Sequence, residues 1–160
     1  MRSRQPDLES FRMQKTLTTL TIIFTAFLFS SLIYVILGFF ILRLPWRPLM
    51  TSSTIIQVIF GTFLVISISI LIVVLKLRQN SFSDQMPRPE TSEHLRRYIL
   101  TKSIIMFALA EVPSILGLVF FLISGNLTLM LILCLISAAG FLLARPSPET
   151  LERLERRFSF

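Results

Sequence analysis

Several residue types that catalytic and metal-binding proteins need are scarce in this chain. Its 160 residues include one cysteine, one histidine and five glycines. A single cysteine excludes a disulfide framework within the chain, and one Cys with one His makes neither a zinc site nor a Cys–His nucleophile pair. No glycine-rich phosphate-binding motif is present. We therefore expect no enzyme, no metal site and no cofactor.

Charged residues are also few. They make up 16% of the chain, against about a quarter in soluble domains, whereas hydrophobic residues reach 53% and the mean hydropathy is +0.74. The net charge of +7 comes from basic residues that stand at the edges of apolar runs, a distribution that suits lipid headgroups better than nucleic acid. The composition predicts a membrane protein whose partners include lipids and exclude nucleic acid.

Four apolar blocks dominate the sequence, at residues 16–42, 52–75, 98–123 and 127–144. Each has 18 residues or more, enough for a helix to cross roughly 30 Å of hydrocarbon. The first block is longer than the apolar core of a signal peptide and no cleavage site follows it, so we expect it to be retained. The blocks predict an all-α membrane protein, a bundle of four transmembrane helices.

Basic residues predict how this bundle is oriented. Fourteen of the sixteen Lys and Arg residues lie in the N-terminal segment 1–15, in or beside the loop 76–97, or in the tail 145–160. By the positive-inside rule these three segments are cytoplasmic, and the helix pairs 16–75 and 98–144 connect them. The prediction is an N-in, C-in, multi-pass protein of the cell membrane, which is the inner, cytoplasmic membrane in a bacterium. The tail carries the spacing of either a short interfacial helix or a frayed, solvated end.

One acidic residue lies inside an apolar block. Glu111 follows Lys102 by nine residues, or about 13 Å of helix, which places it near the middle of the bilayer. A charge at that depth costs at least a few kcal/mol, so the carboxyl should be protonated, paired or turned toward a polar cavity. No basic residue of the chain lies at a comparable depth. The default is a neutral acid that is hydrogen-bonded to a neighbour.

Small and polar residues lie near Glu111 along the chain and in depth. The turn Ser124-Gly125-Asn126 is tight enough to make the last two helices antiparallel neighbours. Small residues on one side of a helix let another backbone approach closely in lipid, and we expect helix packing at Ala110, Ser114, Gly117 and Gly140. The polar intramembrane residues of the other helices are Ser30 and Ser31 near the depth of Glu111, and Tyr34 and Gln57 nearer the outer side. Two roles follow for Glu111. It exchanges a proton or cation, with Ser114 beside it, or it joins helices as a neutral acid.

A resemblance supports the first of these roles. The segment Ala108-Leu109-Ala110-Glu111-Val112-Pro113-Ser114-Ile115-Leu116-Gly117-Leu118-Val119 resembles the carboxylate helix of the rotary ATP synthase c subunit, or proteolipid. Upstream, Pro87-Arg88-Pro89-Glu90 resembles the polar loop of that family. The resemblance implies that Glu111 carries a proton or Na⁺. The second apolar block departs from the family's glycine-rich helix, because it contains only Gly61.

Together these features predict a small integral membrane subunit of a larger, energy-transducing complex that translocates protons or cations. Its partners would be other membrane subunits or further copies of itself. Two alternatives remain open at this point. One is a homo-oligomeric, proton-coupled small transporter, and the other is a purely structural membrane scaffold.

Overall fold

The computed structural model describes the backbone of residues 5–45, 47–50, 52–81 and 92–145, and their side chains from Thr16 onward apart from Ser81 and Ser92. Within this part of the chain there are four helices and no strand: α1 (Gln5–Leu42), α2 (Ser53–Ser81), α3 (Ser92–Ser124) and α4 (Leu127–Ala144). All four are long and apolar enough to cross a membrane. The expectation of an all-α membrane protein with four spanning helices is confirmed.

Three of the helices are longer than the apolar blocks that predicted them. Helix α1 begins at Gln5, inside the segment 1–15; α2 continues to Ser81; and α3 begins at Ser92. The apolar block sets where a helix meets lipid, but backbone hydrogen bonds continue into the polar flank until glycine, proline or a cap stops them. Residues 82–91 and 146–160, and with them the possible interfacial helix of the tail, lie outside the described residues.

The turn between α3 and α4 has a local explanation. Gly125 adopts φ 70°, a left-handed conformation that favours glycine. Asn126 then caps α4, its side chain accepting a hydrogen bond of 3.2 Å from the backbone N–H of Leu129. This turn makes α3 and α4 antiparallel neighbours, as the sequence predicts.

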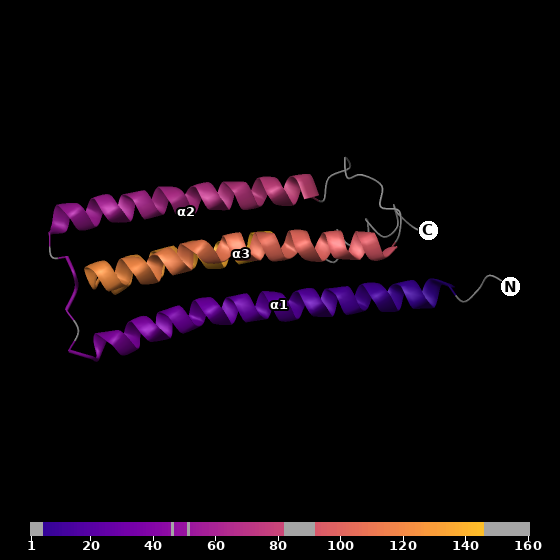
Figure 1. The fold of residues 1–160 in the computed structure, drawn as a ribbon, viewed down its shortest axis with the longest axis horizontal. Helices are drawn as coiled ribbons and strands as arrows, with labels where there is room; N and C mark the ends of the chain where they lie inside the picture. The colour runs from indigo at the N-terminus through magenta and orange to yellow at the C-terminus, as the bar shows by residue number, and fades with distance from the viewer. Residues whose placement is uncertain (1–4, 46, 51, 82–91, 146–160) are drawn as a thin grey trace.

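The two central helices are α3 and α4, each of which contacts all three others. Figure 1 shows α1 and α2 on either side of this pair, with α4 behind α3. The loop from α1 to α2 therefore crosses the end of α3, where the backbone N–H of Met50 donates to the carbonyl of Ile123 at 3.0 Å. Helices α1 and α2 are consecutive in sequence but have only a marginal contact with each other.

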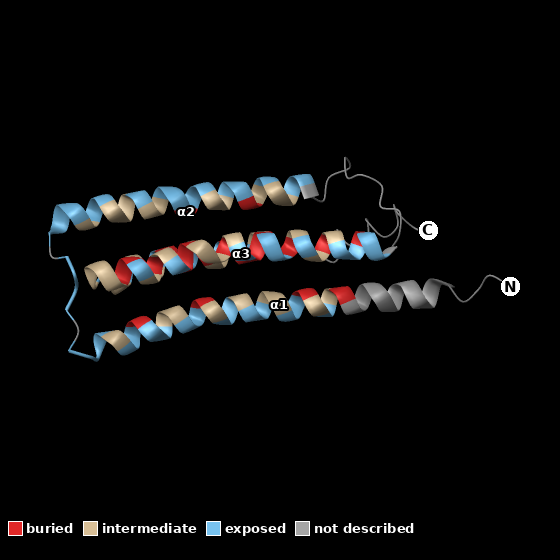
Figure 2. Cartoon of the chain, in the orientation of Figure 1, coloured by how far each residue is buried: buried red, intermediate tan, exposed pale blue. Residues whose placement is uncertain are grey.

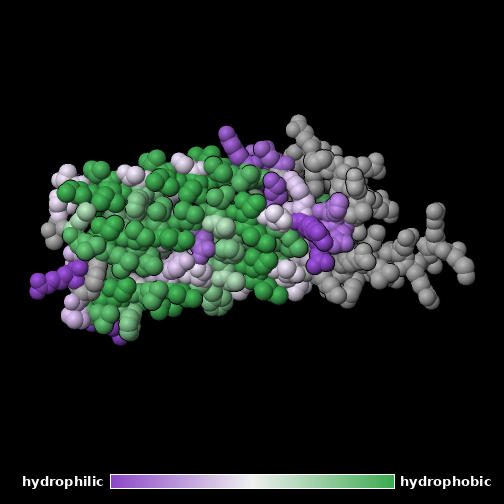
Figure 3. Space-filling model, in the orientation of Figure 1, coloured by the Kyte–Doolittle hydropathy of each residue, from purple (hydrophilic) through white to green (hydrophobic). Residues whose placement is uncertain are grey.

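Burial follows this arrangement. In the most apolar windows of α3 and α4, 44% and 39% of residues are buried, compared with 17% and 11% in α1 and α2 (Figure 2). Large apolar side chains cover the outside, and hydrophilic residues gather at the two ends of the molecule (Figure 3). Such a surface requires a hydrocarbon environment, because a soluble monomer rarely exposes so large an apolar area.

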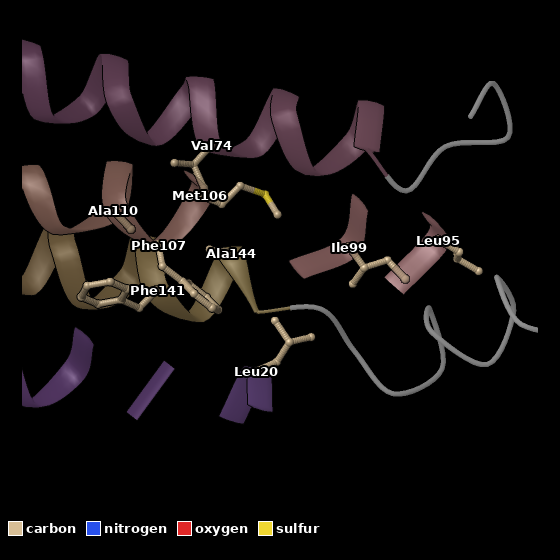
Figure 4. Close-up of a cluster of buried hydrophobic side chains, with 9 residues drawn as sticks. All are labelled: Leu20, Val74, Leu95, Ile99, Met106, Phe107, Ala110, Phe141 and Ala144. Atoms are coloured by element: carbon tan, nitrogen blue, oxygen red, sulfur yellow. The ribbon is translucent and has the colours of Figure 1, made fainter. Parts of the chain in front are cut away.

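The main apolar core lies where α3 and α4 face each other and is joined by one side of α1 and of α2 (Figure 4). Phe107 and Phe141 are fully buried there. Phe24 and Phe27 of α1 lie with their ring centroids 5.8 and 6.1 Å from that of Phe107. This cluster of four rings, the phenylalanine cluster, attaches α1 to the central pair.

Two glycines determine how closely α3 and α4 approach. A Cβ atom at Gly117 would lie 3.1 Å from the carbonyl oxygen of Met130 and 3.2 Å from the Cβ of Leu133. A Cβ atom at Gly140 would lie 3.1 Å from the Cβ of Ala110. Close approach of this kind is the main source of helix association where lipid solvates apolar side chains equally well.

We therefore expect Gly117→Leu to destabilise the bundle by about 1–3 kcal/mol through overpacking. The matched control is Gly61→Leu on α2, because nothing lies within 4 Å of a Cβ atom at that position. Thermal unfolding in mild detergent measures the difference. Equal stability of the two variants would contradict the close α3–α4 contact.

Candidate functional site

The intramembrane carboxyl is held by two hydroxyl groups of the neighbouring helix. Glu111 lies midway along α3, and its Oε1 accepts hydrogen bonds from Ser30 Oγ and from Tyr34 Oη, the latter at 3.0 Å. Ser30 and Tyr34 are four residues apart on α1 and so lie on the same face. Because helical side chains lean toward the N-terminus, the long Tyr34 side chain reaches back to the depth of Glu111.

Two further hydroxyl contacts join the helices beside the carboxyl. Ser31 Oγ and Ser114 Oγ lie 3.0 Å apart between α1 and α3, and both residues are buried. Ser137 of α4 donates a hydrogen bond of 2.6 Å to the carbonyl of Ala110, the residue before Glu111. The α3 segment that carries Glu111 is thus hydrogen-bonded on one side to α1 and on the other to α4. We call these groups the carboxyl cluster: Ser30, Ser31, Tyr34, Glu111, Ser114 and Ser137.

Apolar side chains close both ends of the carboxyl cluster along the bundle axis. On one side lies the phenylalanine cluster, toward the end of the bundle where α3 begins. On the other side Phe121, Met130 and Cys134 are buried, with Tyr34 and Val35 packed against them. The cluster is therefore a polar layer between two apolar layers.

The side of the cluster is more open than its ends. Ser30, Tyr34 and Glu111 are only half-buried, in contrast to Ser31, Ser114 and Ser137. Both hydroxyl donors to the carboxyl bind Oε1, and Oε2 has no hydrogen-bond partner among the described residues. Figure 3 shows a small hydrophilic patch within the hydrophobic surface, over the middle of α3. The carboxyl is thus reached from the side of the bundle.

No basic side chain of the described residues lies at the depth of Glu111. Gly140 packs against Ala110 and against Leu71, which aligns α3, α4 and α2 at this level. From that level Lys76, Lys102 and Arg145 are five to nine residues away, or roughly 7–13 Å along their helices. The structure does not supply an ion pair for the carboxyl from these residues.

The structure places the predicted residues in three groups. Ser30, Ser31, Tyr34, Glu111 and Ser114 belong to the carboxyl cluster. Ala110, Gly117 and Gly140 lie in the α3–α4 contact. Gln57 is exposed near the start of α2 and has no contact with the cluster. The described residues contain no group of three His, Cys, Asp or Glu side chains that could hold a metal ion.

Sequence reasoning missed Ser137. The hydroxyl of Ser137 donates to the backbone carbonyl of Ala110, which joins α4 to α3 beside Glu111. One feature of the sequence could have identified Ser137: it precedes Gly140 by three residues and so lies on the same face of α4. Depth counting alone gave no reason to prefer it over the other serines.

Comparison of the chain with protein-family models, curated proteins and solved structures finds no match in any of the three. The fold and the site define a class: a multi-pass, all-α membrane protein with a hydrogen-bonded carboxyl inside its spanning region.

The contribution of the Ser31–Ser114 contact to stability can be measured by mutation. Each single change to alanine breaks this hydroxyl contact, whereas the double change removes both hydroxyl groups. We expect the two substitutions to couple by about 0.6–1.7 kcal/mol, between the average and the maximum for interhelical hydrogen bonds in a membrane protein. A double-mutant cycle from unfolding in mixed micelles measures the coupling.

The control for this cycle is Ser69→Ala combined with Ser114→Ala. Ser69 is exposed on α2 and donates to the carbonyl of Val65 in its own helix. Those two changes should be additive. Additivity in the Ser31 cycle as well would show that the contact contributes nothing to stability.

Proposed function

We propose that this protein is a small integral membrane subunit of a larger, energy-transducing membrane complex, in which Glu111 exchanges a proton or cation. The observation that carries the proposal is the open carboxyl. Oε1 of Glu111 binds Ser30 and Tyr34, while Oε2 has no partner among the described residues and the side chain is half-buried. Ionisable groups inside membranes are costly and typically mark ion paths.

The geometry favours exchange over a purely structural role for the carboxyl. A neutral acid that only joined α1 to α3 would direct both of its oxygens into the bundle. Here the buried pair Ser31–Ser114 and the phenylalanine cluster already join these helices. The resemblance to the proteolipid helix supports the same role.

A homo-oligomeric, proton-coupled transporter is the second candidate, since a polar group at the side of a helix bundle is also suited to contacts between identical subunits. A structural scaffold is the third. Each of the three functions uses the same bundle, and they differ in whether Glu111 must ionise.

We place both termini and residues 76–97 in the cytoplasm, and the protein in the cell membrane. Support comes from the charges at the two ends of the bundle. Lys76, Arg78, Arg96, Lys102 and Arg145 lie near the end at which α3 begins, while Arg43 and Arg47 are the described basic residues of the other end. This asymmetry fits the positive-inside rule.

Cysteine labelling tests this orientation. In a Cys134→Ser background we expect Leu49→Cys, in the exposed loop after α1, to react in intact cells with a membrane-impermeant maleimide. Asn80→Cys, exposed near the end of α2, should react only after the membrane is permeabilised. The opposite pattern would show an inverted protein, and labelling of both sites in intact cells would contradict four spans.

Substitutions of Glu111 test the exchange role. Glutamine keeps a hydrogen-bonding amide of similar size but cannot ionise. We expect Glu111→Gln to preserve folding and assembly and to abolish proton exchange, measured as proton uptake in proteoliposomes and as turnover of the host complex. Glu111→Leu should in addition weaken assembly, because Ser30 and Tyr34 lose their acceptor.

Chemical modification gives an independent readout. A hydrophobic carbodiimide attacks protonated carboxyls that are accessible from lipid, so mass spectrometry should find dicyclohexylcarbodiimide on Glu111. Glu93, an exposed acid paired with Arg97 outside the apolar region, is the internal comparison.

Full activity of an intact Glu111→Gln complex would reject exchange and leave the structural role.

A further inference from the structure

The carboxyl cluster lies at a surface that the single chain leaves incomplete. Building on the proposed function, we propose that a second copy of this chain docks beside α1 and α3, so that the two Glu111 carboxyls face each other and share one proton. The docking surface, here called the α1–α3 flank, comprises Ala26 and Ser30 of α1 and Ala108 and Glu111 of α3. In this arrangement each copy completes the site of the other.

Hydrogen-bond capacity is the first argument. The two lone pairs of Glu111 Oε1 are used by Ser30 and Tyr34, whereas Oε2 is unused among the described residues. Lipid chains offer neither a donor nor an acceptor to that atom. A polar group of a neighbouring polypeptide at the same depth would complete the site.

Self-complementarity is the second argument. A pair of carboxyls with one proton between them satisfies every group: Oε2–H of one copy donates to Oε2 of the other, and each Oε1 keeps its two hydroxyl donors. The pair holds one negative charge spread over two side chains, which four hydroxyl groups stabilise. Both carboxyls cannot ionise together, because like charges at contact distance oppose it. No change of oxidation state and no further reactant is involved.

The shape of the flank is the third argument. Ala108 lies one turn before Glu111 on the same side of α3, and Ala26 one turn before Ser30 on α1. Both alanines are exposed, although larger apolar side chains cover most of the outer surface. Small side chains next to the carboxyls let two copies approach closely enough for the Oε2 atoms to meet. An interface of this kind is isologous, with the same patch on both subunits of a two-fold dimer.

Cross-linking in proteoliposomes tests the proposal. In the Cys134→Ser background we expect Ala108→Cys to form a disulfide between copies on oxidation with copper phenanthroline at high dilution in lipid. The matched control is Ala139→Cys, an exposed alanine on α4 beside the outward-facing Leu135 and Leu142. It should remain monomeric under the same conditions. Equal cross-linking at both positions would mean random collision and would overturn the proposal.

Steric and chemical variants test the same interface without cross-linking. Ala108→Trp should weaken dimerisation by at least about tenfold, whereas Ala139→Trp should not change it, as measured by energy transfer between labelled copies in liposomes. Glu111→Leu should weaken the dimer similarly, and Glu111→Gln should retain it because amides pair with each other. A chain that stays monomeric at all protein-to-lipid ratios would show that the flank faces lipid or a different subunit.

These outcomes are separable from the proposed function. If the native chain is monomeric but Glu111 still reacts with carbodiimide and supports proton uptake, the second copy is wrong and ion exchange stands. If Ala108→Cys cross-links but Glu111→Gln supports full proton uptake, the dimer is real and the exchange role fails.

Discussion

Everything else in this fold depends on the close contact between α3 and α4. Lipid solvates apolar side chains as well as another helix does, so helices associate in a membrane through close packing and polar contacts. Gly117 and Gly140 allow this approach, and it brings Ser137 within reach of the Ala110 carbonyl. Helices α1 and α2 then pack against the central pair from two sides, with only a marginal contact between them.

The two outer helices are held by different means. Helix α1 combines the phenylalanine cluster with the hydroxyl contacts to Glu111 and Ser114, so part of its attachment depends on polar groups. Helix α2 contributes rings such as Phe60, whose centroid lies 5.5 Å from that of Phe120, and its buried Ser67 binds only a carbonyl of its own helix. A substitution at Glu111 would therefore act on the α1 side of the molecule.

Much of this arrangement could be predicted from the sequence, because its physical causes are local. Apolar length fixed the four spans, and counting residues from the basic flank placed Ser30 and Ser31 near Glu111 in depth. Which side chains form hydrogen bonds between helices does not depend on local sequence. Tyr34 reaches Glu111 although it lies a turn away, Ser137 selects the Ala110 carbonyl, and Gln57 stays outside the cluster. These outcomes depend on the rotation of each helix about its axis, which a periodic run of Leu, Ile and Phe specifies weakly.

The separation of α1 from α2 bears on how the protein is made. These two helices leave the ribosome first, yet the surfaces that bind them belong to the two helices that leave last. Most contacts of α1 and α2 can therefore form only once α3 and α4 are present. The backbone N–H of Met50 donates to the carbonyl of Ile123, and this hydrogen bond holds the loop between α1 and α2 across the end of α3. The contacts of this bundle are thus centred on the C-terminal hairpin, which is synthesised last.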